Sequence, residues 1–547
     1  MNAITNLRKT YNNHETVITL LFFLVLWFGI LMITGTLDSG YHFMDDHEIL
    51  QFQPEIAKTT ITHEAQKFIT NLLHPGFRFR PFYLLHRRLE MKVFGTTLLV
   101  WSIYNAFLAV FTSFLLFLFM RRTGFSQIEA MFFALLTVLG EQAAIWWQLG
   151  PAETPGIFLL AAALLCMAES VYNQKRKKVM TVLFVVFAIL ASWCKESFVL
   201  MLPALVFWKI LLAYQQGSTT PSQKTMGHTI KENSITAAIL LSVCLWELIH
   251  IYNGVTMMKI RYAGSQSLTV FELMKATTVN LLYLGGGLVV VLFVLLALFF
   301  YQRPPKDKTG LILSYLFLAA MITGPQILLY MKAGITERYQ LPGKIGIILL
   351  ILVLYQFLND YFKKSSVKKV WGKKILVVVL VMLVVITLNQ LRITRYTAIG
   401  FTRAGHYIQA WFQSIAHHTG PTDITLVITN PITSMEASYA LQIYMNTEMK
   451  RQNILFSTVQ LDTINKKHNT FWGVLNNTFF ARFKTFSLDK AEDRNLIRAI
   501  LIFPGLEKKF LHYFAARFKA EQFKRYTNAG GYVSYYRESN CNSSGFR

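Results

Sequence analysis

The first candidate chemistry lies just after the first long apolar run of the chain, in the order Asp45, Asp46, His47 and Glu48. Adjacent carboxylates at a membrane interface are costly unless they meet a cation, a metal ion or water. A positioned Asp can act as the general base that accepts the proton of a reacting hydroxyl group. We therefore predict that Asp45 and Asp46 are catalytic. Asp45, Asp46 and Glu48 could also ligate a divalent metal. The alternative is a solvated stretch that merely ends the helix.

Arginines that could bind a phosphate follow in the same polar stretch. Arg78 and Arg80 flank one phenylalanine, and Pro81 restricts the backbone beside Arg80. Arginine forms paired donor contacts to phosphate oxygens, which favours a phosphate-binding role for both. Arg87 and Arg88 fit the alternative, a cationic segment that lies on lipid headgroups.

A lysine–glutamate pair, Lys195-Glu196, lies between two apolar runs. A charge at the centre of a membrane helix costs about 2.5–3.5 kcal/mol on insertion scales. The pair is therefore expected at a membrane edge or beside a polar cavity, where ionisable groups are functional candidates; helix capping is the alternative. Glu153 has no neighbouring cation in the sequence and could face a cavity. We expect Trp146 and Trp147, just before it, to lie in an aromatic belt at the membrane surface.

The last candidate cluster is Glu337, Arg338 and Tyr339, on a short segment that we expect on the non-cytoplasmic side. Membrane proteins keep their excess Lys and Arg on the cytoplasmic side. Arg338 runs against that rule, which favours a ligand-binding role over a topogenic one. On this topology it shares one membrane face with the acidic pair and the earlier cations.

Long apolar runs are the elements that must position these residues. Hydrophobic residues make up 53% of the 547 residues and charged ones only 15%, against about 25% in soluble proteins. Runs of about 20 apolar residues are typical of membrane helices. The clearest are Val17–Leu37, Leu98–Met120, Thr181–Ser192, Asn280–Tyr301, Leu311–Tyr330, Ile345–Leu358 and Ile375–Leu388.

The net charge of +25 does not indicate nucleic acid, because the basic residues stand in short clusters between apolar runs, such as Arg121-Arg122. That spacing is the positive-inside pattern of membrane proteins. With these clusters in the cytoplasm, it predicts about 11 membrane helices, a cytoplasmic N-terminus and a long external loop over 38–96. Short or polar spans leave the count open, and an even count would place the C-terminal part in the cytoplasm.

The composition changes after about Thr394. Short apolar runs there are typical of buried strands. The expected strands are Ile424–Thr429, Ile500–Phe503 and Gly531–Tyr536, and the expected helices are Ser434–Met445 and Leu506–Lys519. We therefore predict a polytopic α-helical membrane protein with two domains, a transmembrane domain over 1–392 and a small extracytoplasmic α/β domain over 393–547.

Taken together, these motifs resemble the GT-C superfamily, integral membrane glycosyltransferases that use lipid-phosphate sugars. The similarity is greatest to tetratricopeptide-coupled protein O-mannosyltransferases and their bacterial relatives, although the repeats are absent. The matching motifs, in order, are Met44-Asp45-Asp46, Phe79-Arg80-Pro81, Tyr104-Asn105, Trp147 through Pro155, Lys195-Glu196, and Glu337-Arg338-Tyr339 with Pro342.

The resemblance implies transfer of a hexosyl or pentosyl group from a polyprenyl-phosphate donor to an acceptor hydroxyl, with inversion and with Asp45 as general base. It implies that Arg80, Lys195 and Arg338 contact the donor phosphate, and we add Arg78. The remaining candidates would contact the acceptor or support the site: His47, Glu48, Glu153, Glu196, Glu337 and Tyr339. Family members differ in their use of a divalent metal, so Mg²⁺ or Mn²⁺ stays open.

The acceptor class (glycan, lipid or protein) is equally open. We expect a bacterial inner membrane, with the C-terminal domain outside the cytoplasm. Two alternatives remain. A secondary transporter or lipid flippase would show inverted repeats and broken helices, for which Gly285–Gly287 and Gly324-Pro325 are candidate breaks. A non-catalytic membrane scaffold would tolerate loss of the acidic pair.

Overall fold

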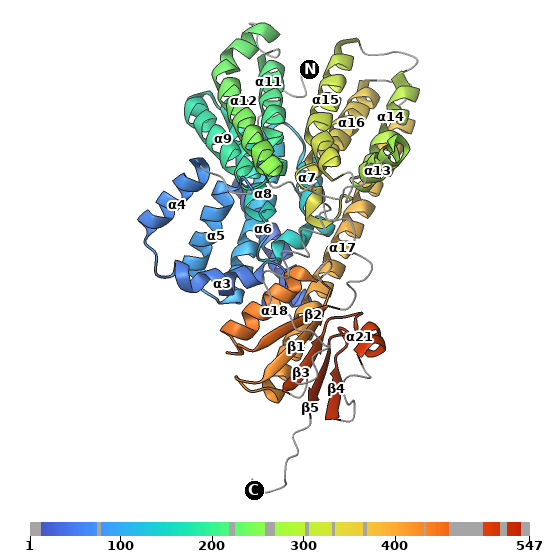
Figure 1. The fold of residues 1–547 in the computed structure, drawn as a ribbon. Coiled ribbons are helices and arrows are strands. Elements are labelled where there is room, and N and C mark those ends of the chain that lie inside the picture. The colour runs from blue at the N-terminus through green and yellow to red at the C-terminus, as the bar shows by residue number, and fades with distance from the viewer. Residues whose placement is uncertain are drawn as a thin grey trace.

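The helical and the sheet-containing parts of the protein lie at opposite ends of an elongated molecule (Figure 1). The computed structural model describes residues 13–73, 78–217, 225–257, 269–300, 306–330, 334–364, 369–430, 434–458, 496–514 and 522–537. Helix α17 (Lys369–His418) leaves the helical part and ends beside the sheet (Figure 1). It is therefore the continuous link between the two parts.

Eight helices in the described ranges are long and apolar enough to cross a membrane, or up to nine with one bent pair. Besides α17 they are α2 (Asn13–Thr34), α6 (Leu98–Arg122), α8 (Glu153–Tyr172), α11 (Met201–Gly217) with the short α10 (Glu196–Val199), α12 (Met226–Met257), α15 (Lys306–Leu329) and α16 (Lys344–Lys364). The predicted polytopic helical class is confirmed.

The predicted count of eleven spans is not confirmed. Two of the expected spans are short helices, α7 (Gln127–Val138) and α9 (Lys177–Ser192). A third, Asn280–Tyr301, coincides with the end of α13 (Val270–Tyr283) and with α14 (Gly286–Phe300), which meet at an angle of 81°. Gly285 lies at this break with a φ of 110°, a conformation that favours glycine. The second candidate break does not occur, because Pro325 lies inside α15.

The segment predicted as a long external loop is mostly helical. After the 3₁₀ turn η1 (Thr36–Asp38) it forms α3 (Asp46–Ile56), α4 (Ile61–Leu73) and α5 (Pro81–Phe94). The guanidinium of Arg88 on α5 pairs with Glu64 on α4, with one bond of 2.9 Å. The segment is therefore a set of short helices, two of them joined by an ion pair, beside the membrane helices.

Three further 3₁₀ turns connect the membrane helices: η2 (Glu141–Trp146), η3 (Gln174–Arg176) and η4 (Glu337–Gln340). Trp146 and Trp147, at and just after the end of η2, are buried at 0% and 2% exposure. The rings of Trp146 and Trp27 pack edge to face at 5.7 Å. The predicted aromatic belt is therefore wrong for this pair, because protein rather than lipid surrounds both rings.

The C-terminal part is an α/β unit with one five-stranded sheet in the order β2-β1-β3-β5-β4. Its strands are β1 (Ile424–Thr429), β2 (Ile454–Thr458), β3 (Ile497–Ile502), β4 (Phe523–Thr527) and β5 (Val533–Arg537). Strands β1, β2 and β3 are parallel, and β5 runs antiparallel to β3 and β4. The helices of this unit within the described residues are α18 (Met435–Thr447) and α21 (Glu507–Phe514). The α/β prediction is confirmed.

The segment after α2 is anchored in the core of the sheet unit. Tyr41 and Phe43 are buried with Trp411 and Phe412 of α17 and with the apolar strands. The Tyr41 hydroxyl also donates to the carbonyl of Ala440 on α18, at 3.1 Å. Residues 45–48 are therefore held between the two parts of the protein. The predicted domain boundary at 392/393 falls inside α17 and stays a prediction.

Candidate functional site

Three cations predicted to bind phosphate come together from distant parts of the chain. Arg80 precedes the first turn of α5, where Pro81 at the first helical position fixes the backbone. Its Nη2 lies 2.6 Å from Glu196 Oε2, and its Nε donates to both Glu196 oxygens at 3.1 Å. Lys195 Nζ contacts the Glu153 carboxylate. Four residues singled out from the sequence thus form one partly buried charge cluster, in the pairs Arg80–Glu196 and Lys195–Glu153.

Tyr339 and Arg338 join this cluster from η4. Lys195 Nζ lies 4.7 Å from the centre of the Tyr339 ring, and Arg338 Cζ lies 5.5 Å from it. Tyr330 stacks on the same ring at 4.6 Å. Cations over an aromatic face are held electrostatically. The Tyr339 ring therefore lies close to both Lys195 and Arg338.

Electrostatics differ between the cations of the cluster. Burial lowers the pKa of Lys195, although the Glu153 carboxylate acts against this. Burial would also lower the pKa of Arg338, but the negative charges of Glu153 and Asp45 outweigh it and raise that pKa. The Arg338 side chain therefore stays protonated and positively charged at the edge of the cluster.

Asp45 adopts a backbone conformation that is rare for a residue with a side chain. Its φ of 66° and ψ of −28° place it in the left-handed region, just before α3, where strain costs about 1–3 kcal/mol. Arg87 Nη2 donates to its carbonyl at 3.3 Å. A Cβ on Gly150 would come within 2.0 Å of Asp45 Cβ. The strained turn aims the carboxylate at Arg338, with Oδ2 lying 3.3 Å from Arg338 Nη1.

Asp46 is adjacent to Asp45 in the sequence, but its side chain lines a pocket that the cation cluster does not line. Its side chain is 1% exposed, and Oδ2 accepts the backbone N–H of His42 at 2.9 Å. Burial raises the pKa of Asp46 from 3.8 to about 8. The two adjacent aspartates therefore have different surroundings, and only Asp45 touches a cation of the cluster.

The residues that follow the acidic pair lie off the cluster. The buried ring of His47 packs against Tyr439 of α18 at 5.4 Å. Glu48 lies 3.9 Å from Arg87, and burial raises the pKa of Glu48. Within the described residues, no group of three or more His, Cys, Asp or Glu side chains is placed to hold a metal ion. Asp45, Asp46 and Glu48 do not stand out as such a group, and the metal site considered from the sequence stays a prediction.

Two further predicted residues lie at the edge of the site. Glu337 is exposed, and its backbone N–H donates to Glu141 Oε2 at 3.4 Å. Arg78 is exposed and lies within electrostatic reach of Arg80 and Glu196. Both residues therefore lie at the exposed edge of the site, and their predicted roles stay predictions.

Sequence reasoning assigned Arg87 to lipid headgroups, and the structure corrects this. Arg87 is 3% exposed, lies 4.5 Å from the Trp101 ring and donates to the carbonyls of Leu149 and Asp45. Arg88 instead pairs with Glu64. Nothing in the amphipathic pattern of this helix separates the two arginines. Glu436 of α18, within electrostatic reach of Asp45 and Arg338, was also missed.

Comparisons with known proteins give structural similarity only. No protein-family model matches the chain, and no curated protein matches it. The fold is similar to the crystal structure of ArnT from Cupriavidus metallidurans bound to undecaprenyl phosphate, with 13% identity, 97% of this chain and 99% of that chain covered, and a TM-score of 0.47. The apo structure of the same protein is 12% identical, with 96% of this chain and 98% of that chain covered and a TM-score of 0.46. A likeness at this level assigns no function by itself.

Proposed function

We propose that this protein is an inverting GT-C glycosyltransferase. It would transfer a sugar from a polyprenyl-phosphate donor to an acceptor hydroxyl at the non-cytoplasmic membrane surface. The observation that carries the proposal is the gathering of Arg80, Lys195 and Arg338 beside the carboxylate of Asp45. A site with an anion-binding side and an adjacent carboxylate suits a reaction in which a phosphate leaves and a hydroxyl loses its proton.

The donor phosphate would bind at Arg338 first. This guanidinium lies 3.3 Å from Asp45 and is 19% exposed, and an arginine carries five N–H donors. Glu196 and Glu153 hold Arg80 and Lys195 in position. Preorganised charges of this kind stabilise the negative charge that develops on a leaving group.

Asp45 would act as the general base. Its side chain is 24% exposed, so an acceptor hydroxyl can reach the carboxylate. The acceptor oxygen attacks the anomeric carbon and forms a new C–O bond, while its proton passes to Asp45. The bond from the anomeric carbon to the phosphate oxygen breaks, and the lipid phosphate leaves with the electron pair. One displacement of this kind inverts the anomeric centre.

The test is transfer of radiolabelled sugar from a panel of polyprenyl-phosphate sugars by the purified full-length protein. We expect Asp45→Asn to lower kcat by about 10²–10⁴-fold, the usual contribution of a general base. Arg338→Ala should weaken donor binding and lower kcat. The matched control is Arg525→Ala, which removes an exposed Arg–Glu507 pair on the sheet unit and should leave transfer unchanged.

Full transfer activity in both Asp45→Asn and Arg338→Ala would refute the assignment. A lipid flippase is the second candidate, because the 81° break between α13 and α14 is typical of transporters. It predicts movement of the lipid-linked sugar between leaflets of a vesicle without transfer. A scaffold predicts neither transfer nor donor binding.

A further inference from the structure

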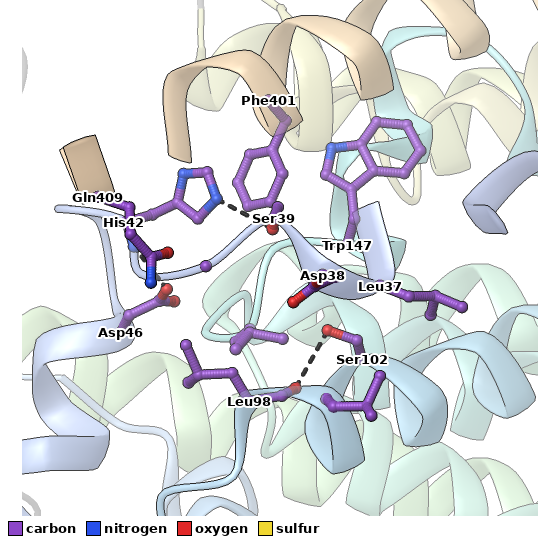
Figure 2. Close-up of a pocket in the computed structure, with 13 residues that line it drawn as sticks. Leu37, Asp38, Ser39, His42, Asp46, Leu98, Ser102, Trp147, Phe401 and Gln409 are labelled. Atoms are coloured by element: carbon purple, nitrogen blue, oxygen red, sulfur yellow. Dashed lines mark hydrogen bonds between the residues drawn. The ribbon is translucent and has the colours of Figure 1, made fainter. Parts of the chain in front are cut away.

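A pocket of about 260 Å³ lies on the other side of the Asp45–Asp46 peptide. It is lined by residues 37–40, by the first turns of α3 and α6, by Trp147 and Leu149, and by α17 (Figure 2). None of the residues that form the cation cluster lines it. Leu149 lines the pocket, while the next residue, Gly150, touches Asp45. The pocket is therefore a separate compartment directly beside the proposed base.

The carboxyl group of Asp46 points into this pocket (Figure 2). Its Oδ2 accepts the His42 backbone N–H, but its buried Oδ1 has no hydrogen-bond partner among the described residues. A buried polar atom left without a partner costs about 1–3 kcal/mol, so such an atom in a native protein indicates a missing partner. A ligand hydroxyl in the pocket would supply that partner.

Aromatic rings form the wall beside this carboxyl group. Phe401 lies between His42 and Trp147 (Figure 2). His42 stacks on Phe401 with 3.6 Å between ring centres and 14° between planes. The His42 ring is held in place by a 3.2 Å contact from Nε2 to the Ser39 hydroxyl. Aromatic side chains of this kind offer a large apolar surface to a ligand.

The charge of the lining excludes a phosphate as the preferred ligand. The lining contains no Lys or Arg, and its ionisable side chains are Asp38, His42 and Asp46. Because burial raises the pKa of Asp46 to about 8, its carboxyl group is largely protonated at neutral pH and can donate as well as accept. Burial and the nearby His406 lower the pKa of His42 to about 3, so its ring is neutral. The wall is thus polar and aromatic, and it carries no cationic side chain that would attract a phosphate.

We infer that this pocket binds a neutral, hydroxyl-rich sugar ring that belongs to the acceptor. The acceptor role rests on the proposed function, whereas the binding of a sugar ring does not. The volume of about 260 Å³ is below the range of about 300–1,000 Å³ for drug-sized ligands and suits a single ring. A hydroxyl projecting from that ring past the Asp45–Asp46 peptide would reach the base, while the donor phosphate occupies the cationic side.

The test uses ligand-detected saturation-transfer NMR of the full-length protein in nanodiscs, with neutral methyl glycopyranosides as probes and inorganic phosphate as the anionic comparison. Phe401→Ala removes the aromatic wall, and Ser102→Leu fills the pocket. We expect each to weaken glycoside binding about tenfold or more, the equivalent of one lost aromatic face. Polyprenyl phosphate should not displace the glycoside.

Two matched controls separate pocket effects from general damage. Phe111→Ala removes a ring that is 43% exposed on α6. Ser314→Leu replaces a serine whose hydroxyl donates to the carbonyl four residues earlier, the same bond that Ser102 makes. Both controls should bind glycosides as the wild-type protein does.

Failure of this inference can be told from failure of the proposed function. If no glycoside binds, or if binding survives both pocket variants, the pocket assignment is wrong even where Asp45-dependent transfer is seen. If polyprenyl phosphate or Arg338→Ala abolishes glycoside binding, the ring belongs to the donor and the acceptor assignment is wrong. Glycoside binding that depends on the pocket, without any transfer, would support the sugar site and refute the glycosyltransferase.

Discussion

The position of the Asp45 carboxylate depends on Gly150, which lacks a side chain and so leaves room for it. A Cβ at position 150 would come within 2.0 Å of Asp45 Cβ and 2.5 Å of its Cγ, so Gly150→Ala must displace the carboxylate. A misplacement of about 1 Å can cost about 10²-fold in rate. We expect kcat for sugar transfer to fall by about this factor in Gly150→Ala, while the purified protein keeps its secondary structure by circular dichroism. Gly400→Ala, where an added Cβ meets nothing within 4 Å, should keep full activity.

For single residues, the sequence predicted which charged side chains belong to the site but not the direction in which each side chain points. Arg338 and Lys195 were candidates because charged side chains in a largely apolar membrane protein are costly. Both lie in the cluster. The division between Asp45 and Asp46 depends on a φ of 66° at Asp45. In this conformation Asp45 packs against Gly150, a residue 105 positions away, and local sequence does not reveal such a contact.

The helix α5 acts as the element that holds the acidic turn in place. Arg87 on α5 donates to the carbonyls of Leu149 and Asp45. The neighbouring Arg88 forms an ion pair with Glu64 of α4 instead. A lysine keeps the charge but lacks the planar fork that reaches two acceptors. We therefore expect Arg87→Lys to lower kcat at least tenfold, as a displaced turn would. Arg88→Lys should stay within about twofold of wild type. Equal kcat values in the two variants would contradict this role for Arg87.

Whole elements were predictable wherever they were uniformly apolar or alternated in a clear strand pattern. Strand β1 matches the expected range Ile424–Thr429, and α18 differs from its expected bounds by only one or two residues. Helices α3, α4 and α5 were not predicted, because a search for long apolar runs passes over short amphipathic helices with a polar face. The bend between α13 and α14 was only one of two candidate breaks, and Gly285 rather than Pro325 produces it.

At the scale of the whole molecule, the buried carboxyl group of Asp46 lies at the junction of the helical part and the sheet unit. The predicted split at 392/393 took no account of this junction, because Tyr41 and Phe43, far from the sheet in sequence, pack into its core. Asp46 lies three residues after Phe43 and lines the pocket against α17. Ionisation of this one group therefore bears on the contact between both parts of the protein.

That position makes the stability of the full protein depend on pH. The pKa of Asp46 is about 8 when folded and about 3.9 when unfolded. Between these values the folded protein holds a proton that the unfolded chain has released, so stability falls as the pH rises from about 4 to about 8. Asp46→Asn cannot ionise and loses this dependence. We expect thermal unfolding, followed by intrinsic fluorescence, to give the variant a Tm a few degrees above wild type at pH 8.5 but not at pH 5. A Tm difference that is the same at both pH values would show that the Asp46 carboxyl group does not stay protonated in the folded protein.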